Sequence, residues 1–208
     1  MARVLVLSPH PDDETIGCGG TLCRHAHEGD EVRVVFLTSG ERGGHGASPE
    51  ATGRRREVEA ARAARILGVR DIEFWRAPDG LLRADVSIVD RLAALLRDQR
   101  PAFVYTAHGG ETHHDHRAAL RILRRALTSA RRAPVVRLFE IWTPLQRLDE
   151  IVDITPWIAT KLRAVRAYRS QNAALRFDEA VKGLNRYRGE MHSWPGGDYA
   201  EVFQVLGT

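Results

Sequence analysis

One imidazole and three carboxylates lie within five consecutive positions near the start of the chain. They belong to His10, Asp12, Asp13 and Glu14, directly after the apolar run Ala2–Leu7. Because neighbouring acidic side chains repel one another, such a cluster needs a bound cation or the positive end of a helix beside it. The cluster therefore predicts either a metal site or the start of a helix that Asp13 caps and that begins near Glu14.

A second group of imidazoles follows the apolar run Ala102–Thr106. It holds four of the nine histidines of the chain: His108, His113, His114 and His116. Histidines can collect in a solvated loop by chance, but both clusters directly follow strand-like runs. If these strands are parallel, their carboxyl ends meet at one edge of the sheet, where open α/β sheets bind ligands. We therefore expect the two clusters to form one site.

Zinc is the metal that these residue types favour. A hydrolytic zinc site takes three imidazole or carboxylate ligands and keeps its fourth position for water. His10, Asp13 and His116 can supply that set, since a spacing of three residues lets His10 and Asp13 converge from one tight turn. Asp12 would then lie beside the ion as the base that accepts a proton from water. Spacing alone does not establish this division between Asp12 and Asp13.

Strand-like and helical segments alternate along the chain. Runs with strand character occur at Ala2–Leu7, Val32–Thr38, Asp71–Trp75, Ala102–Thr106, Val135–Trp142 and Glu150–Asp153. Apolar residues recur at helical spacing in Arg54–Leu67, Asp85–Gln99, Asp115–Arg131 and Pro156–Tyr168. This order predicts one α/β domain over residues 1–208, a Rossmann-like three-layer sandwich whose mainly parallel sheet is covered by helices on both faces. The glycine-rich stretch Gly40–Gly53 predicts a loop over the rim that carries the two clusters.

The composition argues against nucleic-acid and membrane partners. The net charge is +4, but the 31 basic residues are spread among 27 acidic ones instead of forming a basic stripe. No window approaches the roughly 18 consecutive apolar residues of a membrane span, and the chain starts without the pattern of a signal peptide. We expect a soluble, cytoplasmic protein. Cys18 and Cys23 should be packing residues, since their spacing fits neither a disulfide framework nor a metal knuckle.

The two clusters together resemble the paired signature of the PIG-L/LmbE-like family of zinc-dependent N-acetylglucosaminyl deacetylases. The matching motifs are Pro9-His10-Pro11-Asp12-Asp13-Glu14 and His113-His114-Asp115-His116. The resemblance spans nearly the whole chain, because it extends to Arg56 and Glu59 before Leu67-Gly68-Val69, Pro78-Asp79-Gly80, Glu140-Ile141-Trp142, Lys161 through Ser170-Gln171, and Tyr199-Ala200-Glu201. His114 departs from the pattern, since family members commonly carry proline there, and it is a neighbouring competitor of His116 for the metal.

The resemblance implies a zinc-dependent hydrolase that removes the N-acetyl group from an N-acetylglucosamine conjugate and releases acetate and a free amine. It implies that His10, Asp13 and His116 bind zinc and that Asp12, His113 and Asp115 are catalytic. Arg56 matches a family arginine that lines the pocket, with a helix-surface arginine as the alternative. Asp79 follows the third strand and is either a contact to sugar hydroxyls or a turn residue, and Tyr199 is a candidate for the pocket wall. Asp12 would act as the base, His113 would lie near the developing oxyanion, and Asp115 would orient an active-site histidine. Either Asp12 or His113 could protonate the leaving amine. The partner would be a small N-acetylated amino-sugar conjugate, and homo-oligomers are common in the family.

Two other classes stay open at this point. The chain could hold zinc and bind an acylated sugar without hydrolysing it, although a binding protein needs no base such as Asp12. It could also bind a nucleotide, since Gly17-Cys18-Gly19-Gly20 follows the first strand. That fingerprint is incomplete, because Leu22 stands where a third glycine is required and the glycines begin too far beyond the strand. We interpret them instead as close packing of the first helix beside the metal loop.

Overall fold

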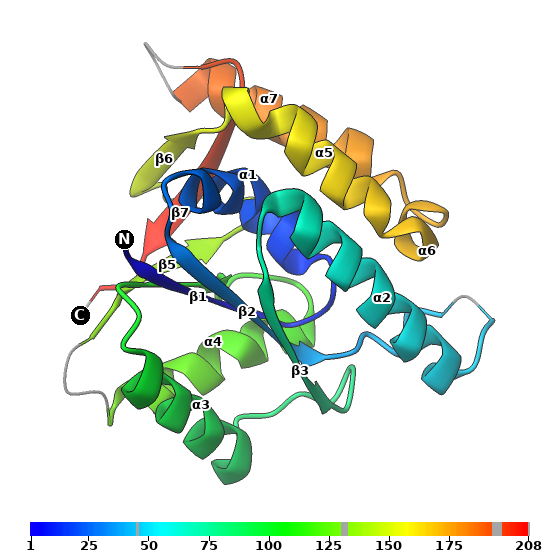
Figure 1. Cartoon of the computed structure of the whole chain (residues 1–208), viewed down its shortest axis with the longest axis vertical. Coiled ribbons are helices and arrows are strands. Elements are labelled where there is room, and N and C mark those ends of the chain that lie inside the picture. The colour runs from blue at the N-terminus through cyan, green and yellow to red at the C-terminus, as the bar shows by residue number, and fades with distance from the viewer. Residues whose placement is uncertain (45, 130–132, 193–196, 208) are drawn as a thin grey trace.

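The computed structural model describes residues 1–44, 46–129, 133–192 and 197–207. Within them, seven strands form one sheet in the order β3-β2-β1-β4-β5-β7-β6 (Figure 1). The strands are β1 Arg3–Ser8, β2 Glu31–Thr38, β3 Asp71–Ala77, β4 Phe103–Ala107, β5 Val135–Phe139, β6 Glu150–Asp153 and β7 Ala200–Val205. The helices are α1 Asp13–His27, α2 Pro49–Leu67, α3 Val86–Gln99, α4 His114–Leu127, α5 Ile158–Ala167, α6 Arg169–Asn172 and α7 Phe177–His192, with a 3₁₀ turn at Thr155–Trp157.

The first five strands are parallel, and β1 lies at their centre. It pairs with β2 on one side and with β4 on the other. Val4 and Val6 point into one apolar cluster and Leu5 and Leu7 into a second, and all four side chains are buried. The run is apolar throughout because both faces of this strand are covered. The parallel arrangement brings the carboxyl ends of the first five strands to the same edge of the sheet.

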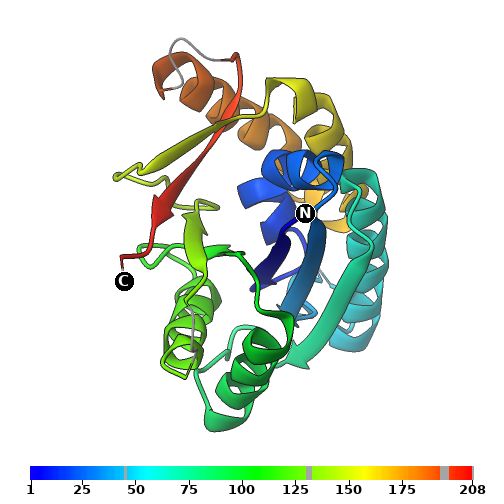
Figure 2. The same cartoon turned by 60° about the vertical axis from the view of Figure 1, so that its left-hand side comes forward.

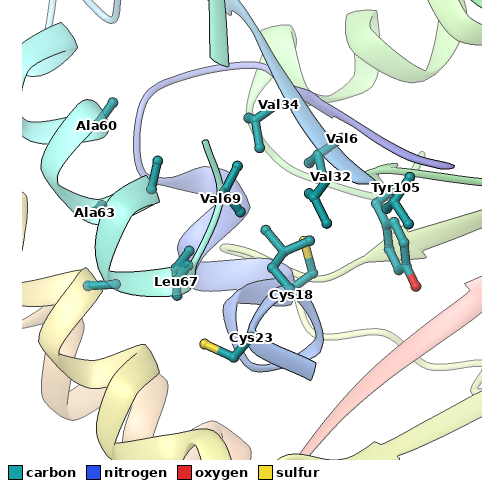
Figure 3. Packing of buried hydrophobic residues seen from close by; sticks show 14 of the residues in the cluster. Val6, Cys18, Cys23, Val32, Val34, Ala60, Ala63, Leu67, Val69 and Tyr105 are labelled. Atoms are coloured by element: carbon teal, nitrogen blue, oxygen red, sulfur yellow. The ribbon is translucent and has the colours of Figure 1, made fainter. Parts of the chain in front are cut away.

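Helices cover both faces of the sheet, which confirms the predicted three-layer α/β class. α1 and α2 pack on one face, with α5 against both of these helices, and α3 and α4 pack on the other face (Figures 1 and 2). α7 lies outside this first layer, against α5 and β7. Figure 3 shows Cys18 and Cys23 of α1 among the apolar side chains between the sheet and α2. Both cysteines are free and buried, which confirms that they are packing residues.

The glycines of α1 permit close approach by neighbouring elements. A Cβ atom at Gly17 would lie 2.2 Å from the ring of Phe139, and one at Gly20 would lie 2.7 Å from Ile154. α1 also carries a kink at Cys18, whose backbone angles are not helical. The structure thus confirms the packing interpretation of these glycines.

Several predicted boundaries of helices, strands and loops are wrong. Gly40–Gly53 is not a continuous loop, because α2 begins at Pro49, where Ser48 caps the helix by accepting a hydrogen bond from the Ala51 amide. Gly53 therefore lies inside a helix. The strand expected over Val135–Trp142 ends at Phe139. α4 ends at Leu127, and the expected end at Arg131 falls outside the described residues.

The carboxyl-terminal part of the fold has elements that the sequence reading did not anticipate. α7 and β7 lie beyond the last predicted helix, and β7 runs antiparallel between β5 and β6. The antiparallel pairing ends the alternation of parallel strands and helices on which the prediction depended. No helix among the described residues is long and apolar enough to cross a bilayer.

Candidate metal centre

The two predicted clusters meet at the carboxyl ends of the parallel strands. The loop after β1 carries His10, and the start of α4, after β4, carries His113 and His116. The ring centroid of His10 lies 4.8 Å from that of His113 and 5.4 Å from that of His116. All three imidazoles line a pocket of about 310 Å³. They do not form a solvated loop, since His10 and His116 are buried.

Asp13 lies between two imidazoles. Its Oδ2 atom is 3.0 Å from Nδ1 of His10 and 3.3 Å from Nε2 of His116. Tetrahedral ligands at about 2.0–2.2 Å from a zinc ion lie roughly 3.3 Å or slightly more from one another. The donor types of His10, Asp13 and His116 therefore suit zinc, and the two distances from Asp13 are close to the spacing of zinc ligands. Two other triads that include His10 could also hold a metal, one with His113 and His116 and one with Asp79 and Asp115.

The charges of this group are strongly coupled. Burial alone would raise the pKa of Asp13, but His116 and His10 hold it well below its usual range. Burial would likewise lower the pKa of His116, yet the charge of Asp13 raises it to about 9. Positive charge on the imidazoles thus stabilises the neighbouring Asp13 carboxylate.

Asp12 occupies the position before α1 with a strained backbone. Its φ of 118° lies in a region that residues with a side chain rarely adopt, at a cost on the order of 1–3 kcal/mol. The Asp12 amide donates to Oε2 of Glu14 over 3.1 Å, and the Asp12 carboxylate lies 3.1 Å from Arg56. The carboxylate makes no capping hydrogen bond. The expectation that Asp13 caps the helix is also wrong, because Asp13 is the first helical residue and faces the imidazoles.

Burial raises the pKa of Asp12 to about 7, although the guanidinium of Arg56 opposes this shift. Arg56 is itself buried in α2 and is not the surface arginine that its helix position allowed. Besides its ion pair with Asp12, it donates to the carbonyl groups of Pro11 and Gly40 over 2.5 and 3.0 Å. Arg56 lines the pocket, but its guanidinium is largely engaged in holding the Asp12 loop.

His113 begins α4 as its capping residue. Its Nδ1 atom accepts a hydrogen bond from the Asp115 amide over 3.2 Å. Burial and the neighbouring imidazoles of His10 and His116 lower the pKa of His113, which favours the neutral ring. A neutral imidazole that accepts at Nδ1 carries its proton on Nε2. His113 can therefore offer one N–H donor.

Asp79 and Asp115 contact the other nitrogen of His10. Its Nε2 atom lies 3.0 Å from Oδ1 of Asp79 and 3.2 Å from Oδ2 of Asp115. Asp115 also accepts hydrogen bonds from the amides of Gly80 and Leu82. These amides hold the Asp115 carboxylate in place, so that it can orient His10.

His114 lies at the surface, and its Nε2 atom is 3.0 Å from the carbonyl oxygen of Leu82. His114 does not line the metal pocket or belong to a candidate metal triad of the described residues, so the structure gives no support to it as a competitor for the metal. Tyr199 is not brought to the site either. Its ring lies beside Arg186 of α7, and its backbone bonds to Ile154 and Thr155.

Sequence reasoning missed Glu111, which is fully enclosed behind the site. Its carboxylate contacts Nδ1 of His116 at 3.2 Å and accepts hydrogen bonds from the amides of Ile141, Trp142 and Thr143. The signal was present, because Glu111 stands within the second histidine cluster. Trp142, in the stretch Glu140-Ile141-Trp142, is half exposed, and the centroid of its ring lies 5.7 Å from that of His113.

Glu14 has a different place from the one expected. It is a buried carboxylate within the first turn of α1, not merely the residue that starts the helix. It accepts hydrogen bonds from the Asp12 amide and from the hydroxyl groups of Thr15 and Tyr168. The sequence held no signal for the Tyr168 contact, which joins residues 154 positions apart.

Comparisons with known proteins agree with this geometry. The family model described as PIG-L, GlcNAc-PI de-N-acetylase, matches residues 5–127. A 1D-myo-inositol 2-acetamido-2-deoxy-alpha-D-glucopyranoside deacetylase from Thermobifida fusca is 32% identical over 78% of this chain, which spans only 61% of that relative.

Two solved structures show the same fold. The N,N'-diacetylchitobiose deacetylase from Pyrococcus horikoshii has a TM-score of 0.87 and 26% identity, over 99% of this chain and 84% of that one. The 4-carboxy-2-hydroxymuconate hydratase from Pseudomonas putida KT2440 has a TM-score of 0.90 and 28% identity, over 100% and 97%. Since the family model covers more than half of the chain, this protein belongs to the PIG-L (LmbE-like) family.

Proposed function

We propose that this protein is a zinc-dependent hydrolase that removes the N-acetyl group from an N-acetylglucosamine conjugate. The observation that carries the proposal is Asp13, held between His10 and His116 with Asp12 directly beside it. The names of its relatives support the same reaction class, since the family model and two of the proteins compared above are de-N-acetylases or deacetylases.

In this proposal His10, Asp13 and His116 hold the metal. A bound zinc ion would supply Lewis-acid activation of water and of the acyl carbonyl group. Asp115 orients His10 through Nε2, and Glu111 orients His116 through Nδ1, as hydrogen-bonded carboxylates commonly do for metal-binding histidines.

Asp12 accepts the proton of the attacking water. Arg56 contacts its Oδ2 atom, whereas Oδ1 has no hydrogen-bond partner among the described residues. Asp12 also lines the pocket. A carboxylate that is fixed by one oxygen and open at the other is suited to a general base.

His113 stabilises the negative charge that develops on the acyl oxygen. Its N–H at Nε2 is the donor for that charge, and its ring lies 4.8 Å from each of the rings of His10 and His116. The proton for the leaving amine comes from Asp12 or from His113. Both residues line the pocket, so either can reach the amine.

A second candidate is the hydration of an unsaturated carboxylic acid. The Pseudomonas putida hydratase favours it, because its structure matches the full length of this chain with the higher of the two TM-scores quoted above. Both reactions use an activated water molecule. They differ in the bond attacked, which is an amide C–N bond in one and a carbon–carbon double bond in the other.

One experiment separates these candidates. Zinc-loaded and chelator-treated protein are incubated with N-acetylglucosamine conjugates and, separately, with 4-carboxy-2-hydroxymuconate. Free amine and acetate are measured for the first set, and the loss of the conjugated double bond is measured for the second. We expect amine release that depends on zinc. Binding of the acetylated sugars without release of acetate would instead support a binding protein, and turnover of the muconate alone would support the hydratase.

A further inference from the structure

Two arginines line the metal pocket, and they differ in what their guanidinium groups do. Arg56 was expected to contact substrate, but it is engaged by Asp12 and by two carbonyl groups. The guanidinium of Arg42 forms no ion pair or hydrogen bond with any described residue, although it lines the same pocket. A free cation at the mouth of a pocket is available to a ligand.

The backbone of Arg42 is tied to the metal centre. Its amide donates to Oδ2 of Asp79 over 2.8 Å, and Oε1 of Glu41 accepts a hydrogen bond from the Asp79 amide over the same distance. The other oxygen of Asp79 contacts His10 at 3.0 Å. Arg42 is therefore placed two contacts away from a proposed metal ligand and does not belong to a detached surface loop.

Gly80 makes room for the Arg42 side chain. A Cβ atom at Gly80 would lie 3.0 Å from Nη1 of Arg42, and the Gly80 φ of 74° is one that glycine adopts without strain. The Gly80 amide donates to Asp115. The Arg42 guanidinium thus lies beside the Gly80 turn, which the Asp115 carboxylate holds in place.

Part of the pocket lining is apolar. Trp142, Ala174, Leu175 and Phe177 contribute to it, and 56% of the surface of both Trp142 and Leu175 is exposed. Among the described residues, the pocket therefore offers metal-binding and acidic groups, apolar side chains and the unpaired cation of Arg42. An acetylated sugar whose reacting group lies at the base would extend its aglycone towards the mouth.

We propose that Arg42 recognises a carboxylate or phosphate group on the aglycone of the substrate. The inference rests on the proposed deacetylase function and adds the chemical class of the conjugate: an N-acetylglucosaminide with a short anionic aglycone. Carboxylates and phosphates both match the planar donor pattern of a guanidinium, so that the protein geometry suits both.

Three glycosides test the inference. They are the N-acetylglucosaminides of glycolate, of the neutral glycolamide and of 2-hydroxyethyl phosphate. We expect kcat/KM for both anions to exceed that for glycolamide, and the larger of the two values identifies the preferred anion. Arg42→Gln should lower the ratio of anionic to neutral kcat/KM by about 10- to 100-fold, the effect of losing one hydrogen bond to a charged group, with the loss mainly in KM.

Two further variants serve as controls. Arg55→Gln removes an exposed arginine of α2 that does not line the pocket, and it should keep the wild-type ratio. Arg42→Lys should keep part of the preference, because it retains the charge without the planar pair of donors. Higher ionic strength should reduce the wild-type ratio, since Arg42 is exposed.

The outcomes separate this inference from the function on which it rests. Acetate release with equal kcat/KM for the three glycosides, or an unchanged ratio in Arg42→Gln, would overturn the role of Arg42 and leave the deacetylase standing. If neither these glycosides nor the conjugates of the first experiment release acetate, the proposed function fails. In that case the Kd values of the three glycosides are measured by calorimetry with the Asp12→Asn protein, with and without the Arg42→Gln change. The role of Arg42 is overturned if the Kd is the same for anionic and neutral glycosides or is unchanged by Arg42→Gln.

Discussion

The amino-terminal 127 residues and the segment after residue 133 contribute to the site in different ways. Every proposed metal ligand and the proposed base lie in the first region, in loops or helix starts at the carboxyl ends of parallel strands. The second region contains none of them. It provides part of the apolar lining of the pocket, through Leu175 and Phe177, and the Tyr168 hydroxyl that reaches Glu14.

The second region also fixes the position of α1, the helix that follows the metal-binding loop. Glu201 of β7 accepts hydrogen bonds from the amides of Gly20 and Thr21, just after the kink in α1. Lys161 of α5 is fully buried and lies 2.6 Å from Glu201, and it also donates to Asn185 of α7. The comparison indicates that the first region carries the reactive groups and that the second determines where α1 places them.

The strongest test of this division removes a metal ligand. Asp13→Ala should lose zinc and reduce acetate release to background, because it takes away the carboxylate between the two imidazoles. Metal analysis and amine release measure the two effects. Full zinc retention would show that another triad, such as His10, His113 and His116, holds the ion.

The next test removes the base and keeps the metal. Asp12→Asn should lower kcat by about 10²- to 10⁴-fold while zinc content stays at the wild-type level, since Asp12 accepts a proton without binding the ion. Metal analysis on the same sample is the control. Undiminished acetate release would remove Asp12 from the mechanism.

A third test addresses the second region. Lys161→Met leaves Glu201 as a buried charge without its partner and should lower the free energy of unfolding by about 3–5 kcal/mol. Urea denaturation measures it. Lys182→Met is the matched control, because Lys182 is an exposed lysine of α7 and should change stability by about 0.5 kcal/mol at most. Similar free energies of unfolding for the two variants would mean that the Lys161–Glu201 pair does not stabilise the position of α1.

The smallest expected effect comes from the contact between Tyr168 and Glu14. Tyr168→Phe removes one hydrogen bond to a buried carboxylate and should destabilise the protein by about 1–3 kcal/mol. Because Glu14 also holds the Asp12 amide, kcat should fall while zinc content is unchanged. Tyr187→Phe, at an exposed position in α7, should change neither quantity. A loss of stability without any change in kcat would limit Tyr168 to a structural role.

The side chains that could react, and the edge of the sheet at which they meet, can be inferred from the sequence alone. The spacing of His10 and Asp13 is local, and a parallel sheet brings the loop after β1 next to the loop after β4. The close packing of the glycines in α1 also followed from position alone. These features depend on nearby residues and on a topology that alternating patterns reveal.

How those side chains are held in place depends on contacts between distant parts of the folded chain. Contacts such as Arg56 with Asp12, Tyr168 with Glu14 and Lys161 with Glu201 join elements that no local pattern connects. The same holds for the two arginines of the pocket. Their residue type is identical, and only the packing of α2 against the Asp12 loop occupies Arg56 and leaves the guanidinium of Arg42 free to meet a ligand.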